Sequence, residues 1–221
     1  MIQPHNANVY SRLEAWHPLE RMVLRDSAPA PTARGEETRR ALLHAAARVF
    51  ATRGVYGVSI ADVAAAADVA PATIYRHFEG KDELARAAYL EGKRAMAAAV
   101  WEGFPSALPV RHAFRELWRR MTRLFVDDTS LFVFLDLRLH GDYLEPALID
   151  EVEVASFAPL VALLARGQRE EVLVDGDPRV LARFLGGVFL GAARGALRPD
   201  GSADAAFLEA VEPLVFASVR R

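Results

Sequence analysis

The sequence predicts an all-α protein, in which a small N-terminal helical domain precedes a larger helical domain. Apolar residues recur with the helical period along most of the chain, and we find neither a convincing strand pattern nor an internal repeat. Short turns rich in Gly, Pro and Asp separate the periodic segments. The chain has 221 residues, 52% of them apolar, and can therefore bury one large core or two modest ones.

Composition narrows the protein class. The chain has no cysteine, which excludes disulfides and thiolate metal sites and makes a reducing cytoplasm the expected compartment. Charged residues interrupt every apolar run near the N-terminus, so no signal peptide is expected, and the uncharged run 184–193 is too short to span a bilayer. The net charge of −2 does not by itself indicate a polyanionic partner such as nucleic acid. Any nucleic-acid site must therefore be argued from local features.

Residues 1–35 read as a flexible N-terminal tail that ends in the Pro/Ala-rich stretch SAPAPTARG. A first domain is expected over residues 36–96, and its first helix places Leu42, Ala46 and Phe50 on one face before Gly54 ends it.

A helix-turn-helix is expected at residues 59–78. Ser59 and Asp62 have the spacing of a capping box, which predicts a short second helix. Asp68 follows in the turn, and Asp is one of the few residues that tolerate a left-handed conformation. Pro71 has the fixed φ of a first helical position, so a third helix of about eight residues is predicted from there.

The remaining helices make up the rest of the first domain and a second domain over residues 97–221. They are expected at roughly 81–99, 110–127, 129–140, 145–168, 177–197 and 203–219.

The third helix has a distinctive outward surface. Helical spacing turns Ile74 and Phe78 toward the core. The opposite face and its flanks consist of Ala72, Thr73, Tyr75, Arg76 and His77. Small and hydrogen-bonding groups flanked by longer donors suit a major groove, where the ridge meets base edges and the flanks meet the phosphates.

Further cations lie close by in the sequence. Lys81 opens the next helix, where free amides and the helix dipole already favour a phosphate. Arg34, Arg39 and Arg40 can reach a minor groove or adjacent phosphates. The alternative for these three is a solvated helix start that neighbouring glutamates partly neutralise.

The spacing of about 50 of the 221 residues resembles the DNA-binding domain of the tetracycline-repressor (TetR) family. The matching positions are Phe50, Gly54, Ser59, Ile60, Val63, Ala64, Ala67, Val69, Thr73 to Phe78 and Lys81 to Leu84. The resemblance implies that Ser59, Thr73, Tyr75, His77 and Lys81 contact DNA. Together with the helix geometry, the expected DNA-binding set is Ser59, Pro71, Ala72, Thr73, Tyr75, Arg76, His77, Lys81, Arg39 and Arg40.

Three residues depart from the family pattern. Asp68 and Ala72 stand where the family usually has Gly, and Ala70 stands where it has Ser or Thr. Loss of the cap hydroxyl at Ala70 should cost about 0.5–2 kcal/mol and removes one phosphate contact. The methyl group of Ala72 can instead touch thymine.

The family resemblance also implies that the last two helices form a four-helix bundle with a second subunit. Three glycines at four-residue spacing support a close helix approach, because each costs about 1 kcal/mol in a helix and needs a reason. The expected homodimer residues are Gly187, Gly191, Gly195, Phe207, Val211 and Leu214. Close packing within one subunit is the alternative for the glycines.

A small-molecule pocket among the C-terminal helices is likewise implied by the resemblance. The bulky apolar candidates are Trp118, Met121, Phe125, Phe132, Phe134 and Phe157, although most such residues in a helical domain are simply core. Asp136, Arg138 and His140 lie within a strongly apolar segment, with Asp136 and His140 on one face. They can orient a polar ligand in an apolar cavity or form an interhelical salt bridge.

Three functions compete. The first is a dimeric, sequence-specific DNA-binding regulator, usually a repressor, which a small-molecule effector releases from its operator. The second is an all-α enzyme, but the sequence has no HExxH, GxSxG or phosphate-cradling loop, and we expect no cofactor, catalytic residue or metal site. The third is an all-α ligand-binding or scaffold protein that does not bind DNA. We favour the first, with double-stranded DNA, an effector and a second copy of the chain as partners and no membrane.

Overall fold

A computed structural model describes residues 33–137 and 143–221 of the chain. Within these ranges it is all-α, as predicted, with isolated β-bridges but no strand. The helices are α2 (Ala33–Arg53), α3 (Ile60–Ala66), α4 (Pro71–Tyr75), α5 (Lys81–Trp101), α6 (Val110–Asp127), α7 (Thr129–Phe132), the π-helix η2 (Val133–Leu137), α8 (Pro146–Arg169), α9 (Pro178–Ala196) and α10 (Ala205–Val219). The expected N-terminal tail, through residue 32, lies outside the described residues.

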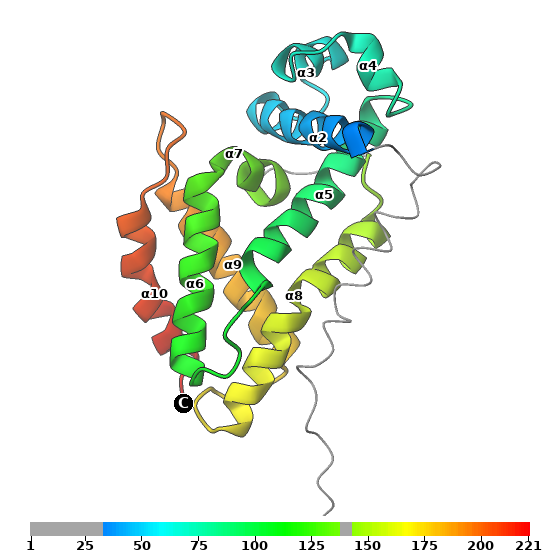
Figure 1. Cartoon of the computed structure of the whole chain (residues 1–221). Helices are drawn as coiled ribbons and strands as arrows, with labels where there is room; N and C mark the ends of the chain where they lie inside the picture. The colour runs from blue at the N-terminus through cyan, green and yellow to red at the C-terminus, as the bar shows by residue number, and fades with distance from the viewer. Residues whose placement is uncertain (1–32, 138–142) are drawn as a thin grey trace, which may run out of the picture.

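The helices form two groups that α5 connects (Figure 1). Helices α2, α3 and α4 gather at one end of the molecule, and α5 runs from them into the larger group that contains α6, α8, α9 and α10. One core cluster lies under α2–α5 and extends to Phe134, Leu135 and buried residues between Tyr143 and Ala155, and a second lies among α6, α8, α9 and α10. Helix α5 therefore packs against both groups and connects them.

The local signals of the helix-turn-helix are present in the structure. The Ser59 hydroxyl accepts the Asp62 amide at 3.1 Å, and the Asp62 carboxylate accepts the Ser59 amide at 2.8 Å, which completes the predicted capping box. Asp68 has φ 55° and makes the left-handed turn. Pro71 begins α4, and Ala70 before it supplies no side-chain cap, as its methyl group requires.

Two helices are shorter than predicted. The third predicted helix ends at Tyr75 after five residues, and the His77 amide bonds three residues back to the Ile74 carbonyl at 2.9 Å, which tightens the chain into a turn. The helix predicted at 129–140 is a single α-helical turn, α7, followed by η2. The rest of that segment lies outside the described residues.

Polar contacts fix α10 against α6. The buried Trp118 indole donates to the Leu208 carbonyl at 2.8 Å. Arg111 forms a two-pronged ion pair with the buried Glu212 carboxylate, and its guanidinium lies 4.5 Å from the centre of the Phe216 ring. Among the described residues, we find no helix whose length and hydropathy suit a membrane span.

Candidate functional sites

Helix α4 presents a small exposed surface at the end of the molecule. Ile74 is fully buried and Phe78 is 2% exposed, so these two side chains hold the helix on the core. Pro71, Ala72, Tyr75 and Arg76 are exposed on the other side, with Tyr75 at 59%, and Thr73 is half-buried. The arrangement leaves a row of small groups beside a phenol and a guanidinium, all accessible to a large partner.

His77 is placed differently from Tyr75. It follows the end of α4, its ring is half-buried, and its Nε2 atom is buried with no hydrogen-bond partner in the described part of the chain. Burial lowers the pKa of His77 below its usual value, and the nearby positive charges of Arg76 and Arg39 lower it further. His77 is therefore neutral at pH 7 and does not present a cation on this surface.

Lys81 is tied to the loop that precedes α3. Its ammonium group donates to the Val58 carbonyl at 3.1 Å and lies 5.6 Å from the centre of the Tyr56 ring. Tyr56 is 58% exposed, so the loop places a second phenol on the same end of the molecule. The ammonium of Lys81 thus connects α5 to the helix-turn-helix.

The remaining predicted DNA-binding residues have mixed surroundings. Arg40 is exposed, whereas Arg39 is half-buried and its guanidinium lies 5.3 Å from the centre of the Phe78 ring. Ser59 is exposed, but its hydroxyl is occupied by the capping box with Asp62. Arg34 begins α2, and its side chain lies outside the described parts of the structure.

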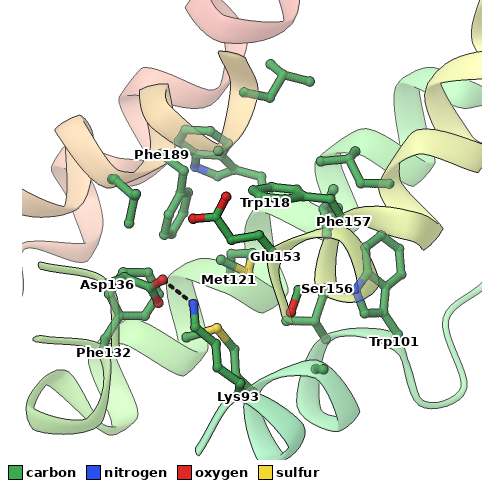
Figure 2. A pocket seen from close by; sticks show the side chains of 18 of the residues that line it. Lys93, Trp101, Trp118, Met121, Phe132, Asp136, Glu153, Ser156, Phe157 and Phe189 are labelled. Carbon is green, nitrogen blue, oxygen red and sulfur yellow. Dashed lines mark hydrogen bonds and ion pairs between the residues drawn. The ribbon is translucent and has the colours of Figure 1, made fainter. Parts of the chain in front are cut away.

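A second candidate site is an apolar cavity of about 180 Å³ among α5, α6, α8, α9 and the α7–η2 segment (Figure 2). Six aromatic side chains line it. They are Trp101, Phe114, Trp118, Phe132, Phe157 and Phe189. Gly186 on α9 makes room for one of them, because a Cβ atom there would lie 2.7 Å from Cζ of Phe157.

A buried ion pair crosses one side of the cavity. Lys93 of α5 donates to the Asp136 carboxylate of η2, and the two side chains are only 10% and 16% exposed. The ammonium also lies 5.7 Å from the centre of the Tyr89 ring. Burial raises the pKa of Tyr89, and the charges of Asp136 and Glu153 raise it further, so this phenol stays protonated.

Two further polar groups lie on α8. The Glu153 carboxylate reaches in among the aromatic rings (Figure 2) and also pairs with Arg183 of α9 at 3.1 Å. The Glu153 side chain is 39% exposed and that of Arg183 is 70% exposed, so this pair lies at the mouth of the cavity. The Ser156 hydroxyl is buried and has no hydrogen-bond partner among the described residues. It can therefore donate to, or accept from, a bound molecule.

The α7–η2 segment joins the cavity to the helix-turn-helix end. Phe132 and Asp136 face the cavity, whereas Phe134 packs against Phe50 of α2 with ring centres 5.8 Å apart. Just before α7, Asp128 lies 3.2 Å from the His44 ring of α2. The α7–η2 segment therefore contacts both the cavity and α2.

Comparison with known proteins identifies a relative of the N-terminal domain. Residues 42–88, which run from α2 through the helix-turn-helix into α5, match the model described as "Bacterial regulatory proteins, tetR family". This part of the chain is similar to the DNA-binding domain of the TetR family. No curated protein matches it.

Solved TetR-family structures share the fold along most of the chain. A TetR-family regulator from Marinobacter aquaeolei VT8 has a TM-score of 0.71 and 21% identity, covering 85% of this chain and 97% of that chain. One from Shewanella sp. PV-4 has a TM-score of 0.69 and 22% identity, covering 83% and 98%. AibR, solved with isovaleryl coenzyme A and operator DNA, has a TM-score of 0.67 and 23% identity, covering 81% and 98%.

The predicted ligand-binding residues divide into three groups. Trp118, Met121, Phe132, Phe157 and Asp136 line the cavity. Phe125 and Phe134 do not line it and are buried in the two cores. His140 and Arg138 lie outside the described residues. Asp136 forms an interhelical salt bridge, and that salt bridge is itself part of the cavity wall.

Sequence reasoning missed the partners of Asp136. Lys93, Glu153 and Ser156 come from other helices, and no local motif connects them. One signal was available for Lys93, since it lies four residues after Tyr89 and four before Ala97, on the apolar stripe of α5. A charge on such a stripe indicates a buried partner. Among the described residues, no group of three His, Asp or Glu side chains is arranged to hold a metal ion.

The predicted dimer residues lie on α9 and α10. Gly187 and Gly191 are exposed, and an added Cβ atom would meet nothing within 4 Å at either. Gly195 is also exposed, and a Cβ there would make an ordinary contact with the Phe207 ring at 3.4 Å. Phe207 is 42% exposed and Leu214 is 71% exposed, while Val211 is half-buried.

Proposed function

We propose that this protein is a homodimeric transcriptional regulator of the TetR family that binds operator DNA through α4 and is released when a small molecule enters the cavity. The observation that carries the proposal is the exposed α4 surface, in which Tyr75, Arg76 and Ala72 project from a helix anchored by buried Ile74. A helix held in this way can enter the major groove. The regulator acts without a cofactor, has no enzymatic role and works in the cytoplasm.

The geometry suggests distinct roles for the exposed side chains. Ala72 and Thr73 lie at the start of α4, where a recognition helix contacts base edges. Tyr75 and Arg76 lie at its end and suit phosphate oxygens. Tyr56 is a further phosphate donor that the sequence did not predict, because Lys81 holds its loop beside the helix-turn-helix.

The effector role rests on the connection between cavity and helix-turn-helix. A molecule that displaces Asp136 or Phe132 moves the α7–η2 segment, and Phe134 transmits this movement to Phe50 of α2. The helix α5 offers a second connection, because Lys93 lines the cavity and Lys81 contacts the loop before α3. A ligand need only bind one arrangement a few kcal/mol more tightly to shift the population.

The dimer rests on the unpartnered face of α9 and α10. Val180, Phe184, Gly187 and Gly191 are exposed along α9, and Leu214 is exposed on α10. Exposed apolar groups beside helix surfaces without side chains favour close packing with the same face of a second copy. AibR, whose structure contains operator DNA and isovaleryl coenzyme A, is a family member that binds both kinds of partner, and this supports the same combination here.

A mobility-shift experiment tests the proposal. The full chain is incubated with the DNA upstream of its own gene at about 50 and 200 mM salt, and we expect specific retention that weakens steeply at the higher salt. Arg76→Ala should lower retention about tenfold. Arg115→Ala, an equally exposed arginine on α6, is the matched control and should leave retention unchanged.

The opposite outcome has a clear meaning. If wild-type protein retains no DNA, or if Arg76→Ala and Arg115→Ala behave alike, then α4 is not a recognition helix. The chain would then be a ligand-binding protein of the same fold, a result that the missing side-chain cap at Ala70 would help to explain.

A further inference from the structure

The charges around the cavity do not balance. The described lining residues include one ammonium, Lys93, and two carboxylates, Asp136 and Glu153, which gives a formal charge of −1. Lys93 and Asp136 neutralise each other inside the wall. The carboxylate of Glu153 remains, and its partner Arg183 is not a lining residue and is 70% exposed. A molecule in the cavity therefore meets an excess of negative charge.

The rings around this carboxylate have a related property. Figure 2 shows the side chains of Trp118, Phe157 and Phe189 near Glu153. The face of an aromatic ring carries the negative side of its quadrupole. Aromatic faces attract a cation within about 6 Å, and Trp does so most strongly. The rings and the carboxylate thus favour the same sign of charge on a ligand.

From this arrangement we propose that the cavity binds a small lipophilic organic cation, with its charged head between Glu153 and the aromatic rings. The inference rests on the proposed role of the cavity as an effector site and deepens it by giving the chemical class of the effector. The buried Ser156 hydroxyl, which has no partner among the described residues, supplies a hydrogen bond to a polar group of the ligand.

An anionic ligand fits the same wall less well. A carboxylate or sulfonate would have to separate Lys93 from Asp136 before it could use the ammonium. It would also place a third negative charge beside Asp136 and Glu153 in an apolar surrounding, where like charges repel strongly. A cation leaves the Lys93–Asp136 pair intact and only loosens Glu153 from the exposed Arg183.

The size of the cavity limits the ligand. Apolar cavities of about 150 Å³ bind benzene. The volume here, about 180 Å³, admits one aromatic ring with a small head group. Phenyltrimethylammonium, tert-butylbenzene and benzenesulfonate are suitable probes, because each joins one ring to a tetrahedral head and they differ mainly in charge.

The test is a calorimetric titration of the full chain with these three probes. We expect phenyltrimethylammonium to bind about tenfold more tightly than tert-butylbenzene, and benzenesulfonate to bind more weakly than either. Glu153→Gln keeps the shape of the side chain and should weaken binding of the cation about tenfold while changing binding of tert-butylbenzene by less than about twofold. Arg183→Gln should strengthen binding of the cation about twofold, because it frees Glu153.

Several results would overturn the inference: benzenesulfonate binding most tightly, equal affinity for the cation and the neutral probe, no binding of any of the three, or cation affinity unchanged by Glu153→Gln. The Arg183→Gln variant keeps the test decisive if Glu153→Gln does not fold. DNA retention is measured separately. If the cation binds without releasing DNA, the proposed ligand class is supported and the proposed effector role is contradicted. If the neutral probe binds as tightly as the cation and releases DNA, the ligand class is contradicted and the effector role is supported.

Discussion

Substitution of Lys93 tests most directly whether the cavity wall contains a buried ion pair. Lys93→Met keeps the length of the side chain but leaves the Asp136 carboxylate unpaired, with only 16% of that side chain exposed. Removing one partner of a buried ion pair typically costs about 3–5 kcal/mol, and the adjoining cavity lets water relieve part of this. We therefore expect a loss of about 3 kcal/mol in the free energy of unfolding.

The double variant distinguishes the loss of the whole ion pair from the loss of one partner. Lys93→Met with Asp136→Leu removes both charges, and replacing a whole buried pair by apolar residues is often neutral. Its stability should lie within about 1 kcal/mol of wild type, giving a coupling energy of about 2 kcal/mol or more. Arg94→Met, which breaks an i,i+3 pair with Glu91 on the same helix, is the control and should cost less than about 0.5 kcal/mol.

The assay is equilibrium unfolding in urea, followed by circular dichroism at one fixed protein concentration, since a dimer's stability depends on concentration. Equal losses for Lys93→Met and Arg94→Met, or additive effects in the double variant, would refute the buried pair.

Three further predictions concern other parts of the chain. Leu214→Glu should shift the protein toward monomer in analytical ultracentrifugation, whereas Val154→Glu on α8, similarly exposed at 73%, should not; a monomeric wild type would contradict this. The lowered pKa of His77 means that the unfolded state binds a proton more readily than the folded state, so the free energy of unfolding should decrease as the pH drops through about 6.5. In urea titrations at pH 7.5 and 5.5, His77→Asn should show a smaller decrease than wild type, and an equal decrease would show that His77 is not responsible. Gly54→Ala should lower the free energy of unfolding by about 1 kcal/mol in the same titrations, because Gly54 has a left-handed backbone conformation (φ 74°) after α2. Gly54→Asn should lower it less, and equal losses for the two variants would contradict the backbone conformation as the cause.

The sequence predicted the parts of the fold that depend on local interactions. The capping box of Ser59 and Asp62 and the left-handed turn at Asp68 each depend on residues within a few positions of one another. The length of α4 was mispredicted, because apolar spacing alone continued the helix past Tyr75, whereas the His77 amide bonds to the Ile74 carbonyl in a tighter turn. This early end also explains why His77 lies half-buried rather than on the outward flank of a helix.

The cavity was less predictable because it is formed between elements. Phe125 and Trp118 occupy the same helix and have similar apolar character, yet only Trp118 reaches the cavity. The difference is set by how α6 rotates against α9 and α10, which helical periodicity does not specify. The Lys93–Asp136 pair joins positions 43 residues apart in the chain, so the sequence could predict a buried charge but not its partner.

The most direct measurement for the whole account is a hydroxyl-radical footprint of the protein on the DNA upstream of its gene. Two copies of α4 in successive major grooves predict two protected segments about 34–36 Å apart, or a multiple of this, with inverted-repeat sequence symmetry, and weaker protection of both with Tyr75→Ala. A single protected segment, protection without symmetry, or a footprint that Tyr75→Ala leaves unchanged would contradict the role assigned to α4.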